Sequence, residues 1–520
     1  MPPHEKNDLS GRGWVRRHSD PILSVADAAA WEKRLLTTEE AEWAAMLRAG
    51  AAVAAAVEED SREIGGLPPK ASLLVLVGKG HNGGDALLAA AAFLDRFPAA
   101  TVSVVLVFGE EVMRPLARRA LETLRRHGDR VRWTDAASWP KSASGFDVCL
   151  DGIFGFQFRP PVDEATGRLI EAVNASSSIA LQAAIDLPSG LGGAPGAPVF
   201  RADFTYATGI VKSAVASSEN VSSAGRVRYL DLGFFPRTGE PAAGAERVLL
   251  PSLLEPLGRI RPAGADKRTY GHVVLVGGSR QYPGAILMAA EAAVRGGVGL
   301  ATAWVPDMLV PEYAARLPEV MWNGWPTVDT GFLSPAVVPK ILESLTKATA
   351  LLVGPGLGAE KPTTEAVRQL IAKSPCPAVC DADALRPEVI SAATGRAAIA
   401  TPHAGEFQRM ANGKSLRDFC RETGIVVTLK GPRTRICDGE EEYFSFFGGP
   451  VLSRGGSGDL LAGLTAGLLA QFAGDLVLAA TQAVAWHGQA ADLLAREKGQ
   501  VAVHTTQLLD YLPPVLRRRS

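Results

Sequence analysis

Apolar runs that read as β-strands alternate with helix-like segments, and this alternation restricts the fold more than any other feature of the sequence. LLVLV (73–77) precedes DALLAAAAFLDRF (85–97), and TVSVVLVFG (101–109) precedes RPLARRALETLRRHG (114–128). Continuously apolar strands separated by helices are typical of a parallel sheet that is buried on both faces. The sequence therefore predicts an α/β fold of three layers, with helices on either side of a sheet.

The alternation occurs twice, and the interruption between the two series predicts a domain boundary. The second series begins at HVVLVGGS (272–279), and the preceding segment PRTGEPAAGAERVLL (236–250) is rich in Pro, Gly and Ala, as linkers are. A chain of 520 residues is also too long for one ordinary hydrophobic core. We expect two α/β domains, at residues 1–238 and 250–520, joined by a linker at 239–249.

Composition disfavours several classes of partner. Lys plus Arg (54) nearly balance Asp plus Glu (55), so no excess of positive charge would attract nucleic acid or an anionic membrane. The five cysteines form no CxxC pair, which favours a reduced protein without a zinc site. The N-terminal segment lacks the apolar stretch of a signal peptide, and the alanine-rich runs are too short to cross a bilayer. We expect a soluble, cytoplasmic protein with neither nucleic acid nor membrane as a partner.

A G-x-G-x-x-G pattern, formed by Gly78, Gly80 and Gly83, follows the first of these apolar strands. Such glycines let the backbone approach a phosphate, and the N-terminus of the following helix favours negative charge. The acidic residue that NAD dehydrogenases carry about 20 residues further on is missing here. This absence disfavours a conventional NAD dehydrogenase, and a simple strand-to-helix turn that needs glycine stays open.

Three further blocks each stand at the end of a predicted strand, where open α/β sheets bind ligands. They are HNGGD (81–85), DGIFGF (151–156) and DLPSG (186–190). In this order the blocks resemble those of the NAD(P)HX epimerase family, also called the YjeF N-terminal family. The resemblance covers roughly residues 20–235 and implies a Rossmann-like domain that interconverts the R and S epimers of hydrated NADH and NADPH at ring carbon 6.

The resemblance to the epimerases also implies roles for individual residues. Asn82, Asp151 and Ser189 would be oxygen ligands of a potassium ion, a hard cation that such oxygens suit. Asp186 would lie beside the epimerised carbon, where a carboxylate can act as a base or stabilise charge. The hydrated dinucleotide would be bound by the 81–85 loop, by the 155–161 segment and by Asp186, that is, by His81, Asn82, Gly83, Gly84, Asp85, Gly155, Phe156, Gln157, Phe158, Arg159, Pro160, Pro161 and Asp186.

The sequence departs from the epimerase pattern at two positions, because His81 replaces the first Asn of the NNGGDG block and Ala86 replaces its last Gly. Neither change removes a carboxylate or the expected ligand Asn82, although each can reshape the loop. For Asp186 a purely structural role stays open, as a helix or turn cap before Pro188.

The second half contains no G-x-x-x-x-G-K-[ST] motif, so a P-loop nucleotide site is excluded. Instead, six motifs occur in a fixed order, and all but the last follow an apolar strand. In this order they resemble the ribokinase-like superfamily, and in detail the ADP/ATP-dependent NAD(P)HX dehydratase family, from about residue 250 to 512. The motifs are VGGSRQYPGA (276–285), GPGLG (354–358), DADAL (381–385), TPHAGE (401–406), KGPRT (430–434) and GGSGD (455–459).

The resemblance to the dehydratases implies three groups of site residues. Asp459 would be the catalytic residue, facing the hydroxyl group of the hydrate. The hydrated nicotinamide would contact Ala285, Gly356, Gly358, His403 and Asp459. The nucleotide phosphates would be bound by Lys430, Gly431, Pro432, Arg433, Thr434 and Gly458.

The implied chemistry is phosphorylation followed by elimination. The superfamily's aspartate removes a proton from a hydroxyl as this attacks a nucleotide phosphate, and backbone N–H groups stabilise the developing charge. The phosphorylated hydroxyl then leaves, which regenerates NAD(P)H. ADP or ATP is the expected co-substrate, with Mg²⁺ bound mainly through phosphate oxygens.

Several residues near these motifs keep two interpretations. Asp381, Asp383 and Glu406 are candidates to organise Mg²⁺, although a DADAL aspartate is equally compatible with a helix cap. A lone histidine such as His403 is often structural, and Arg454 is read either as a further phosphate contact or as a solvated side chain.

These observations predict a bifunctional enzyme that repairs NADHX and NADPHX, and self-association into a homo-oligomer is expected from the resemblance. Two alternatives stay open. The first is a ribokinase-like small-molecule kinase fused to a non-catalytic binding domain. The second is a dehydratase whose N-terminal half is a degenerate binding or scaffolding module.

Overall fold

The computed structural model describes residues 11–135, 145–155, 158–237, 244–327, 332–472 and 474–517. These residues form two compact units. The N-terminal unit comprises Pro21–Gly244 and Ala495–Gln500, and the C-terminal unit comprises Ala245–Leu494, the residues after Val501 and the segment that ends at Asp20. Within these described ranges, no helix is both long and apolar enough to cross a bilayer.

A seven-stranded, wholly parallel sheet forms the centre of the N-terminal unit. Its central strands consist mostly of buried residues, which explains their continuous apolar runs, whereas residues of the edge strands are partly exposed. From one edge to the other the strands are β4 (Val131–Asp135), β3 (Thr101–Leu106), β2 (Ser72–Val77), β5 (Phe146–Gly152), β6 (Ile179–Ile185), β7 (Phe204–Thr208) and β9 (Arg226–Leu230).

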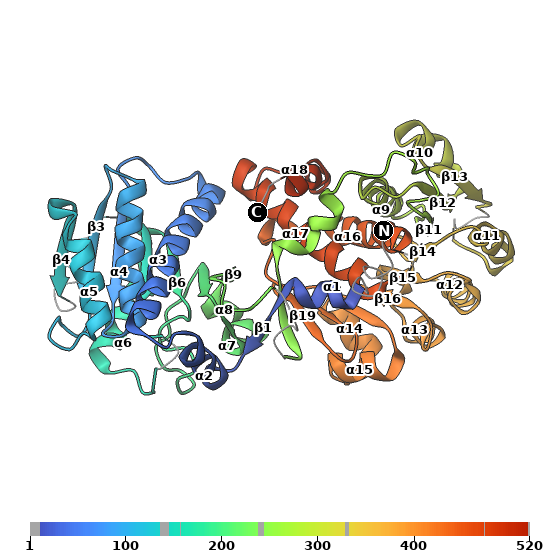
Figure 1. The fold of residues 1–520 in the computed structure, drawn as a ribbon. Helices are drawn as coiled ribbons and strands as arrows, with labels where there is room; N and C mark the ends of the chain where they lie inside the picture. The colour runs from blue at the N-terminus through green and yellow to red at the C-terminus, as the bar shows by residue number, and fades with distance from the viewer. Residues whose placement is uncertain are drawn as a thin grey trace. The chain divides into compact units, whose positions relative to one another are not determined.

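Helices cover both faces of this sheet, which confirms the expected three-layer architecture. Helices α3 (Glu39–Ser61), α4 (His81–Arg96) and α5 (Pro115–Arg125) lie side by side over one face (Figure 1) and share one buried apolar cluster with β2 and β3. Helix α6 (Glu164–Asn174) packs on the other face through a second cluster. A short parallel pair, β1 (Ser19–Leu23) with β8 (Val211–Lys212), and α2 (Val25–Leu35) complete the part of the unit that is relevant to function.

The order of the strands determines where a ligand can bind in this unit. The chain runs outward from β2 through β3 to β4, and then returns to place β5 on the other side of β2. At such a reversal the loops after the two central strands separate and leave a crevice at their carboxyl ends. The HNGGD block follows β2 and the DGIFGF block begins at the end of β5, so these two blocks meet at the crevice.

The C-terminal unit contains a larger mixed sheet. Its strands are parallel from β13 to β17, β18 is antiparallel to both of its neighbours, and β10 is parallel to β19. In spatial order the strands are β13 (Met321–Trp325), β12 (Leu300–Pro306), β11 (His272–Val276), β14 (Ala350–Val353), β15 (Ala378–Cys380), β16 (Ala398–Ala400), β17 (Val426–Leu429), β18 (Thr434–Cys437), β19 (Glu442–Ser445) and β10 (Glu246–Leu249).

Two groups of helices cover this sheet. Helices α9 (Pro283–Arg295) and α16 (Ser457–Gln471) pack closely together, because a Cβ atom at Gly463 would lie only 2.0 Å from the carbonyl oxygen of Ala289. Helix α17 (Leu476–Lys498) follows α16 in the chain. The other group shares one large buried cluster with the strands and comprises α11 (Val338–Leu345), α12 (Lys361–Lys373), α13 (Pro387–Ala393), α14 (Ala404–Ala411) and α15 (Leu416–Thr423).

Short helices occupy the connections and the ends of the described chain. They are α1 (Gly11–Arg17), α7 (Ser213–Ala216), α8 (Val221–Ala224), α10 (Val310–Arg316) and α18 (Leu512–Arg517).

The end of the expected linker 239–249 is strand β10 of the C-terminal unit, and the two compact units also differ from the division at 1–238 and 250–520 in two short segments elsewhere. Helix α1 belongs to the C-terminal unit, where Arg16 Nε lies 2.9 Å from a carboxylate oxygen of Glu441. Residues 495–500 belong to the N-terminal unit, where Arg496 donates to buried Asp60 at 2.8 Å. Both segments are short and charged, and hydrophobic periodicity carries no information about such electrostatic contacts.

Candidate active sites

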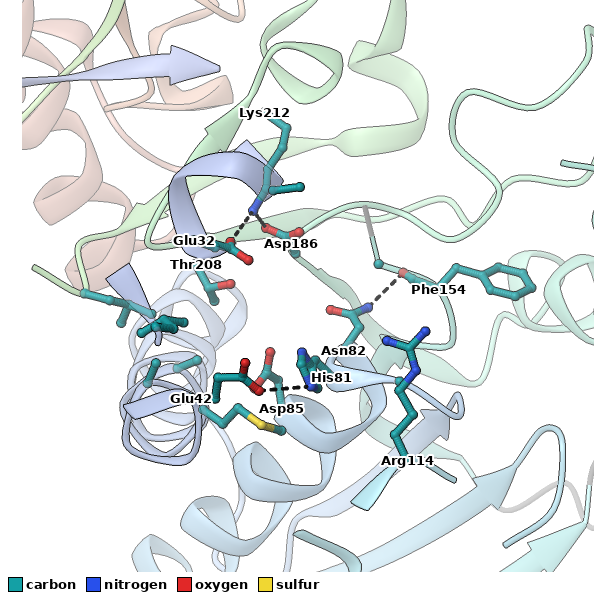
Figure 2. Close-up of a pocket in the computed structure, with 18 of the residues that line it drawn as sticks. Glu32, Glu42, His81, Asn82, Asp85, Arg114, Phe154, Asp186, Thr208 and Lys212 are labelled. Atoms are coloured by element: carbon teal, nitrogen blue, oxygen red, sulfur yellow. Dashed lines mark hydrogen bonds and ion pairs between the residues drawn. The ribbon is translucent and has the colours of Figure 1, made fainter. Parts of the chain in front are cut away.

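The N-terminal unit contains a cavity of about 560 Å³ at the carboxyl ends of β2, β5 and β6. Helices α2 and α3 contribute its other wall. Figure 2 shows carboxylates on two sides of the space and the side chain of Arg114 at a third. The polar residues that line the cavity are Glu32, Lys33, Glu42, Lys79, His81, Asn82, Asp85, Arg114, Asp186, Thr208 and Lys212.

Asp186 stands at the end of β6 and forms a buried ion pair with Lys212. The Lys212 ammonium, whose side chain is 1% exposed, donates to Asp186 Oδ1. Burial raises the pKa of Asp186 above its ordinary value, although Lys212 lowers it in opposition. The backbone of Asp186 is left-handed, with φ of +66°, a conformation that few non-glycine residues adopt. The carboxylate therefore serves the ion pair, and the cap interpretation of Asp186 is wrong.

Glu32 of α2 faces the same ammonium group from the opposite side (Figure 2). Its Oε1 lies 3.9 Å from Lys212 Nζ, outside hydrogen-bond distance. Burial raises the pKa of Glu32 to about 7, opposed by Lys212 and reinforced by the charges of Asp186 and Glu42. This carboxyl group therefore changes its protonation state close to neutral pH.

Two further titratable groups that line the cavity, Asp85 and His81, belong to the first turns of α4. The Oδ1 atom of Asp85 is buried and has no hydrogen-bond partner within the described residues. Burial raises the pKa of Asp85 well above its ordinary value, and the charges of Asp186 and Glu32 raise it further. His81 Nε2 lies 3.7 Å from Glu42 Oε2, and burial lowers the pKa of this histidine.

The three residues expected to bind potassium lie together beside the cavity. Ser189 Oγ donates to Asp151 Oδ1 at 2.6 Å, and the backbone N–H of Phe154 donates to Ser189 Oγ at 2.9 Å. Asn82 Nδ2 donates to the carbonyl oxygen of Phe154 at 2.8 Å, so its amide faces the same backbone turn. Burial raises the pKa of Asp151 to about 6, against hydrogen bonds from Ser189 and Ile153.

The other epimerase residues predicted from the sequence separate into three groups. His81, Asn82, Asp85, Gly155, Phe158 and Asp186 line the cavity. Gly83 and Gly84 are buried behind it, while Arg159, Pro160 and Pro161 are exposed and are not among the lining residues. Phe156 and Gln157 lie outside the described residues.

The expected 81–85 loop is in fact the first turn of α4, which begins at His81. Gly80 precedes it in an extended conformation, and a Cβ atom at Gly83 would lie 2.2 Å from the carbonyl oxygen of Gly78. Two glycines at a helix start oppose helix formation on propensity alone. Tight packing against the loop after β2 overrides that preference.

In the C-terminal unit, the carboxyl ends of β15, β16 and β17 bring together another lysine–aspartate pair. Lys430 Nζ donates to Asp381 Oδ1 at 3.0 Å, and Thr401 Oγ1 donates to the same oxygen at 2.7 Å. Burial lowers the pKa of Lys430, but Asp381, Glu406 and Asp459 raise it by more, so the ammonium form is favoured. The side chain of Asp381 makes no capping hydrogen bond, and the cap interpretation is wrong for this aspartate.

Asp459 lies in the first turn of α16, next to this pair. Gly456 precedes the helix with φ of +90°, which favours glycine, and a Cβ atom at Gly458 would lie 3.3 Å from Lys430 Nζ. Burial raises the pKa of Asp459 to about 6; the charges of Asp381 and Asp383 add to this effect and Lys430 opposes it. Asp459 is therefore a carboxylate at neutral pH, with a proton affinity suited to general-base catalysis.

The GPGLG segment is hydrogen-bonded to Asp383, whose charge acts on Asp459. The backbone N–H of Gly358 donates to Asp383 Oδ2 at 2.8 Å. Gly356 has φ of +68°, and a Cβ atom there would lie 3.1 Å from the Cβ of Ala285 at the start of α9. The structure thus brings Ala285, Gly356 and Gly358 together, and Asp383 connects them to the surroundings of Asp459.

His403 caps helix α14 and also adjoins Lys430. Its Nδ1 accepts from the backbone N–H of Gly405 at 3.1 Å, and Glu406 Oε2 accepts from the His403 N–H at 2.8 Å. The backbones of His403 and Lys430 form an isolated parallel bridge. His403 has the structural role that the sequence left open, and its position in this bridge places it beside the lysine–aspartate pair.

The 430–434 segment connects β17 to β18 and contains an unusual arginine. Arg433 is 7% exposed, and its three guanidinium nitrogens have no hydrogen-bond partner within the described part of the chain. Burial lowers its pKa to about 10. Gly431 and Pro432 are exposed, and Thr434 Oγ1 donates to the Gly431 carbonyl at 3.2 Å. A buried guanidinium without partners is the arrangement that an anionic ligand would complete.

Arg454, which precedes the GGSGD motif, is anchored to the protein. It donates to the carbonyl oxygens of Val503 at 3.0 Å and Val501 at 2.6 Å. The interpretation of Arg454 as a solvated side chain is therefore wrong.

Sequence reasoning missed Glu32 and Lys212, although both line the N-terminal cavity. A lysine directly after an apolar segment, as in GIVKSA (209–214), was a signal for Lys212. No signal distinguished Glu32 from Asp27, the other acidic residue of its helix.

In the part of the chain that the structure describes, no group of three or more His, Cys, Asp and Glu side chains is arranged to hold a metal ion.

Comparison with known proteins gives two family matches. A family model described as NAD(P)H-hydrate dehydratase matches residues 273–514, and one described as YjeF-related protein N-terminus matches residues 43–214.

Curated relatives match both halves at once. The chain is 33% identical to the bifunctional NAD(P)H-hydrate repair enzyme Nnr of Moorella thermoacetica, across 89% of this chain and 90% of the relative. It is 35% identical to the protein of the same name from Gloeobacter violaceus, across 95% and 97% of the two chains.

Solved structures resemble about half of the chain. The ADP/ATP-dependent NAD(P)H-hydrate dehydratase from Bacillus subtilis, co-crystallized with ATP/Mg²⁺, is 28% identical with a TM-score of 0.42, covering 50% of this chain and 93% of that one. A ribokinase-like superfamily protein from Enterococcus faecalis is 28% identical with a TM-score of 0.47, covering 54% and 98%.

Proposed function

Because this chain belongs to the family of bifunctional NAD(P)H-hydrate repair enzymes, we propose that its two sites perform successive steps of one repair. The N-terminal site interconverts R- and S-NAD(P)HX. The C-terminal site uses ADP or ATP to dehydrate the S epimer to NAD(P)H. We assign the first activity to the domain within residues 1–238 and the second to the domain within 250–520.

One observation carries this proposal: each unit has its own lysine–aspartate pair at the carboxyl ends of its parallel strands. Lys212 pairs with Asp186 and Lys430 pairs with Asp381. Each pair adjoins a second carboxyl group whose pKa is raised toward neutrality, to about 7 at Glu32 and about 6 at Asp459. Two separate groups of this kind support two acid–base activities in one chain.

For dehydration, Asp459 accepts the proton of the substrate hydroxyl as the oxygen attacks a nucleotide phosphate. Lys430 lies close enough to Gly458 to bind the transferring phosphate group at the start of α16. The electron pair of the ring nitrogen expels the phosphorylated oxygen as phosphate and forms an iminium bond to ring carbon 6. Loss of the proton from ring carbon 5 then supplies the electrons of the new ring double bond, and the first pair returns to the nitrogen of NAD(P)H.

We propose that the 430–434 segment and Gly458 bind the nucleotide phosphates. The partnerless guanidinium of Arg433 supports this assignment, since an anion would supply the counter-charge that the described residues do not. Pro432 contributes no N–H group, so the phosphate contacts of this segment fall to its other residues.

Magnesium supplies positive charge at the phosphate oxygens when it is bound with the nucleotide. The available carboxylates fit indirect binding. Asp381 is occupied by Lys430 and Thr401, and Glu406 by its helix cap, while Asp383 receives one N–H of the GPGLG segment. We propose that Mg²⁺ is held chiefly through phosphate oxygens.

We also propose a potassium site formed by Asn82, Asp151 and Ser189. The donor set fits a hard monovalent cation, because it offers amide, hydroxyl and carboxylate oxygens within one backbone turn. Asp151 is fully buried, and within the described ranges it has no ion pair to Lys or Arg. Bound potassium would supply the missing positive charge and fix the Phe154 turn beside the cavity.

A cytoplasmic location and self-association complete the proposal. All five cysteines are free, as in a reducing compartment, and the expectation of a homo-oligomer rests on the family resemblance.

The decisive experiment supplies pure R- and pure S-NADHX to the full-length protein, with and without ADP or ATP and Mg²⁺. We expect S-NADHX to yield NADH only when nucleotide is present, and R-NADHX to do the same after epimerisation. No NADH from either epimer would refute the repair function and favour a small-molecule kinase. NADH from S-NADHX alone would instead show that the N-terminal domain is a degenerate binding module.

A further inference from the structure

We infer that Glu32 is the residue that transfers the proton during epimerisation, and that Asp186 and Lys212 are positioning residues that form a fixed ion pair beside it. The inference rests on the proposed epimerase function of the N-terminal cavity. It assigns a catalytic role to a helix that carries none of the family's motif blocks.

Asp186 is poorly available as a base. Its Oδ1 accepts directly from the Lys212 ammonium, and both side chains are almost excluded from water. Protonating Asp186 would leave the buried ammonium of Lys212 without a hydrogen-bonded counter-ion, which costs several kcal/mol. The Lys212 ammonium therefore opposes protonation of Asp186, although burial raises the pKa of this carboxyl group.

Glu32, in contrast, is available to accept a proton. It lines the cavity, its side chain is 22% exposed, and its Oε1 lies 3.9 Å from Lys212 Nζ, so no direct hydrogen bond fixes its charge. Figure 2 shows its carboxyl group beside the ion pair at the wall of the space. Glu32 is thus close to the positive charge and still free to receive a proton from a ligand.

The charges around Glu32 come from four other elements. Lys212 of β8 favours its carboxylate form, whereas Asp186 after β6 and Glu42 of α3 favour its protonated form. Asp85 of α4 also lies within electrostatic reach of Glu32. With burial, these influences place the pKa of Glu32 at about 7, so that both protonation states occur near neutral pH.

The reaction needs only such a group and no external reagent. The Glu32 carboxylate accepts the proton of the hydroxyl on ring carbon 6, while the bond between this carbon and the ring nitrogen breaks. The electron pair of that bond goes to the nitrogen and is delocalised toward the carboxamide, and a carbonyl group forms at the carbon. After a half-turn of the carbonyl, the nitrogen attacks its other face and Glu32 returns the proton to the oxygen.

The test is the variant Glu32→Gln in the full-length protein, with epimerisation of R-NADHX followed by NMR in the absence of nucleotide. Omitting nucleotide stops dehydration, so epimerisation is measured alone. We expect kcat to fall by at least about 100-fold, the usual contribution of a general base, with little change in KM. The matched control is Glu40→Gln, which makes the same charge change at an exposed position that does not line the cavity.

A pH profile distinguishes a catalytic from a structural role. In the wild type, kcat/KM for epimerisation should fall as the pH drops through about 7, because the carboxylate form of Glu32 is the base. Glu32→Gln should lose this dependence, and Glu32→Asp should keep it at a reduced rate. The aspartate variant carries the test if the glutamine variant does not fold.

The outcomes separate the two levels of inference. Wild-type protein that dehydrates S-NADHX but does not epimerise R-NADHX would refute the epimerase function itself. A wild type that epimerises, together with a folded Glu32→Gln variant whose kcat is within about threefold of it and whose pH profile is unchanged, would overturn the role of Glu32.

Discussion

The lysine–aspartate pairs of the two units are built alike but differ in their exposure to water. The pair of Lys212 and Asp186 is sealed, with side chains 1% and 6% exposed. In the pair of Lys430 and Asp381, the lysine side chain is 21% exposed and the aspartate also accepts from Thr401. In the first pair the Lys212 ammonium favours the carboxylate form of Asp186 against the effect of burial, whereas the more exposed Lys430 can turn toward a phosphate.

The carboxyl groups next to the two ion pairs, those of Glu32 and Asp459, also come from different kinds of position in the chain. Glu32 is delivered by α2, which precedes the whole sheet of its unit in the chain, while Asp459 is part of the glycine-rich helix start itself. The comparison teaches that a buried ion pair can organise acid–base chemistry by leaving a second carboxyl group beside it with a raised pKa.

The largest change in rate is expected at Asp459, in the site of the C-terminal unit. Asp459→Asn should lower the rate of S-NADHX dehydration by about 10³-fold or more, because the variant retains the shape but not the base. Epimerisation of R-NADHX should be unchanged. NADH formation and NMR of the epimers measure the two activities on one sample. Dehydration at the wild-type rate would refute the role of Asp459.

The sealed pair should depend on its lysine for folding as well. Lys212→Met leaves the Asp186 carboxylate buried without its counter-ion, which we expect to destabilise the N-terminal unit by about 3–5 kcal/mol. Lys430→Met should cost less, about 1–2 kcal/mol, since Thr401 Oγ1 still donates to the buried carboxylate of Asp381. Hydrogen exchange in a urea series on the full chain, read from peptides of each unit, measures both.

A double variant sharpens that prediction. Lys212→Met combined with Asp186→Asn removes both charges and should recover part of the lost stability. If the double variant is no more stable than Lys212→Met, the cost arises from lost packing and not from an uncompensated charge.

Substitution of Arg433 should weaken the binding of the nucleotide. Arg433→Gln should raise KM for ADP or ATP by about tenfold, the effect of one lost charge-assisted hydrogen bond, without destabilising the protein that lacks nucleotide. Arg435→Gln is the matched control, because Arg435 lies two residues further on and pairs with Glu442 at 3.0 Å. Equal KM values in the two variants would contradict the assignment.

The smallest effect concerns pH. Asp459 must be deprotonated to act as a base, so kcat/KM for dehydration should decline as the pH falls through about 6. Because Lys430 lowers the pKa of Asp459, Lys430→Met should move this decline to higher pH. A profile of kcat/KM against pH for the two proteins checks the direction, and a shift to lower pH would contradict it.

Much of the fold could be predicted because the central strands are apolar throughout. The expected strand 73–77 corresponds to β2 at Ser72–Val77, and the helix-like segment 85–97 corresponds to most of α4 at His81–Arg96. The short strands β18 and β19 were not predicted, since each is only four residues long and includes two polar residues, as TRIC and EYFS. Their pairing is decided by the neighbouring strand β17, which sequence periodicity does not reveal.

Site residues could be predicted from the sequence only where they lie within a recognisable motif. Asp459 stands inside a glycine motif, and the motif drew attention to it. Glu32 and Lys212 are 180 positions apart, and only the pairing of β1 with β8, next to α2, brings them within 3.9 Å. A single sequence records each of them as an ordinary charged residue.

The left-handed backbone at Asp186 limits how this position can change during evolution. Most side chains are strained at such φ values, whereas glycine, asparagine and aspartate tolerate them. Glycine would relax the backbone but abandon the carboxylate, and asparagine would keep the shape but leave Lys212 without its counter-ion. Glutamate, the usual conservative exchange for aspartate, would keep the charge at the cost of backbone strain. The position is therefore constrained twice, by conformation and by charge, and we expect drift to be slower here than at the cavity's other carboxylates.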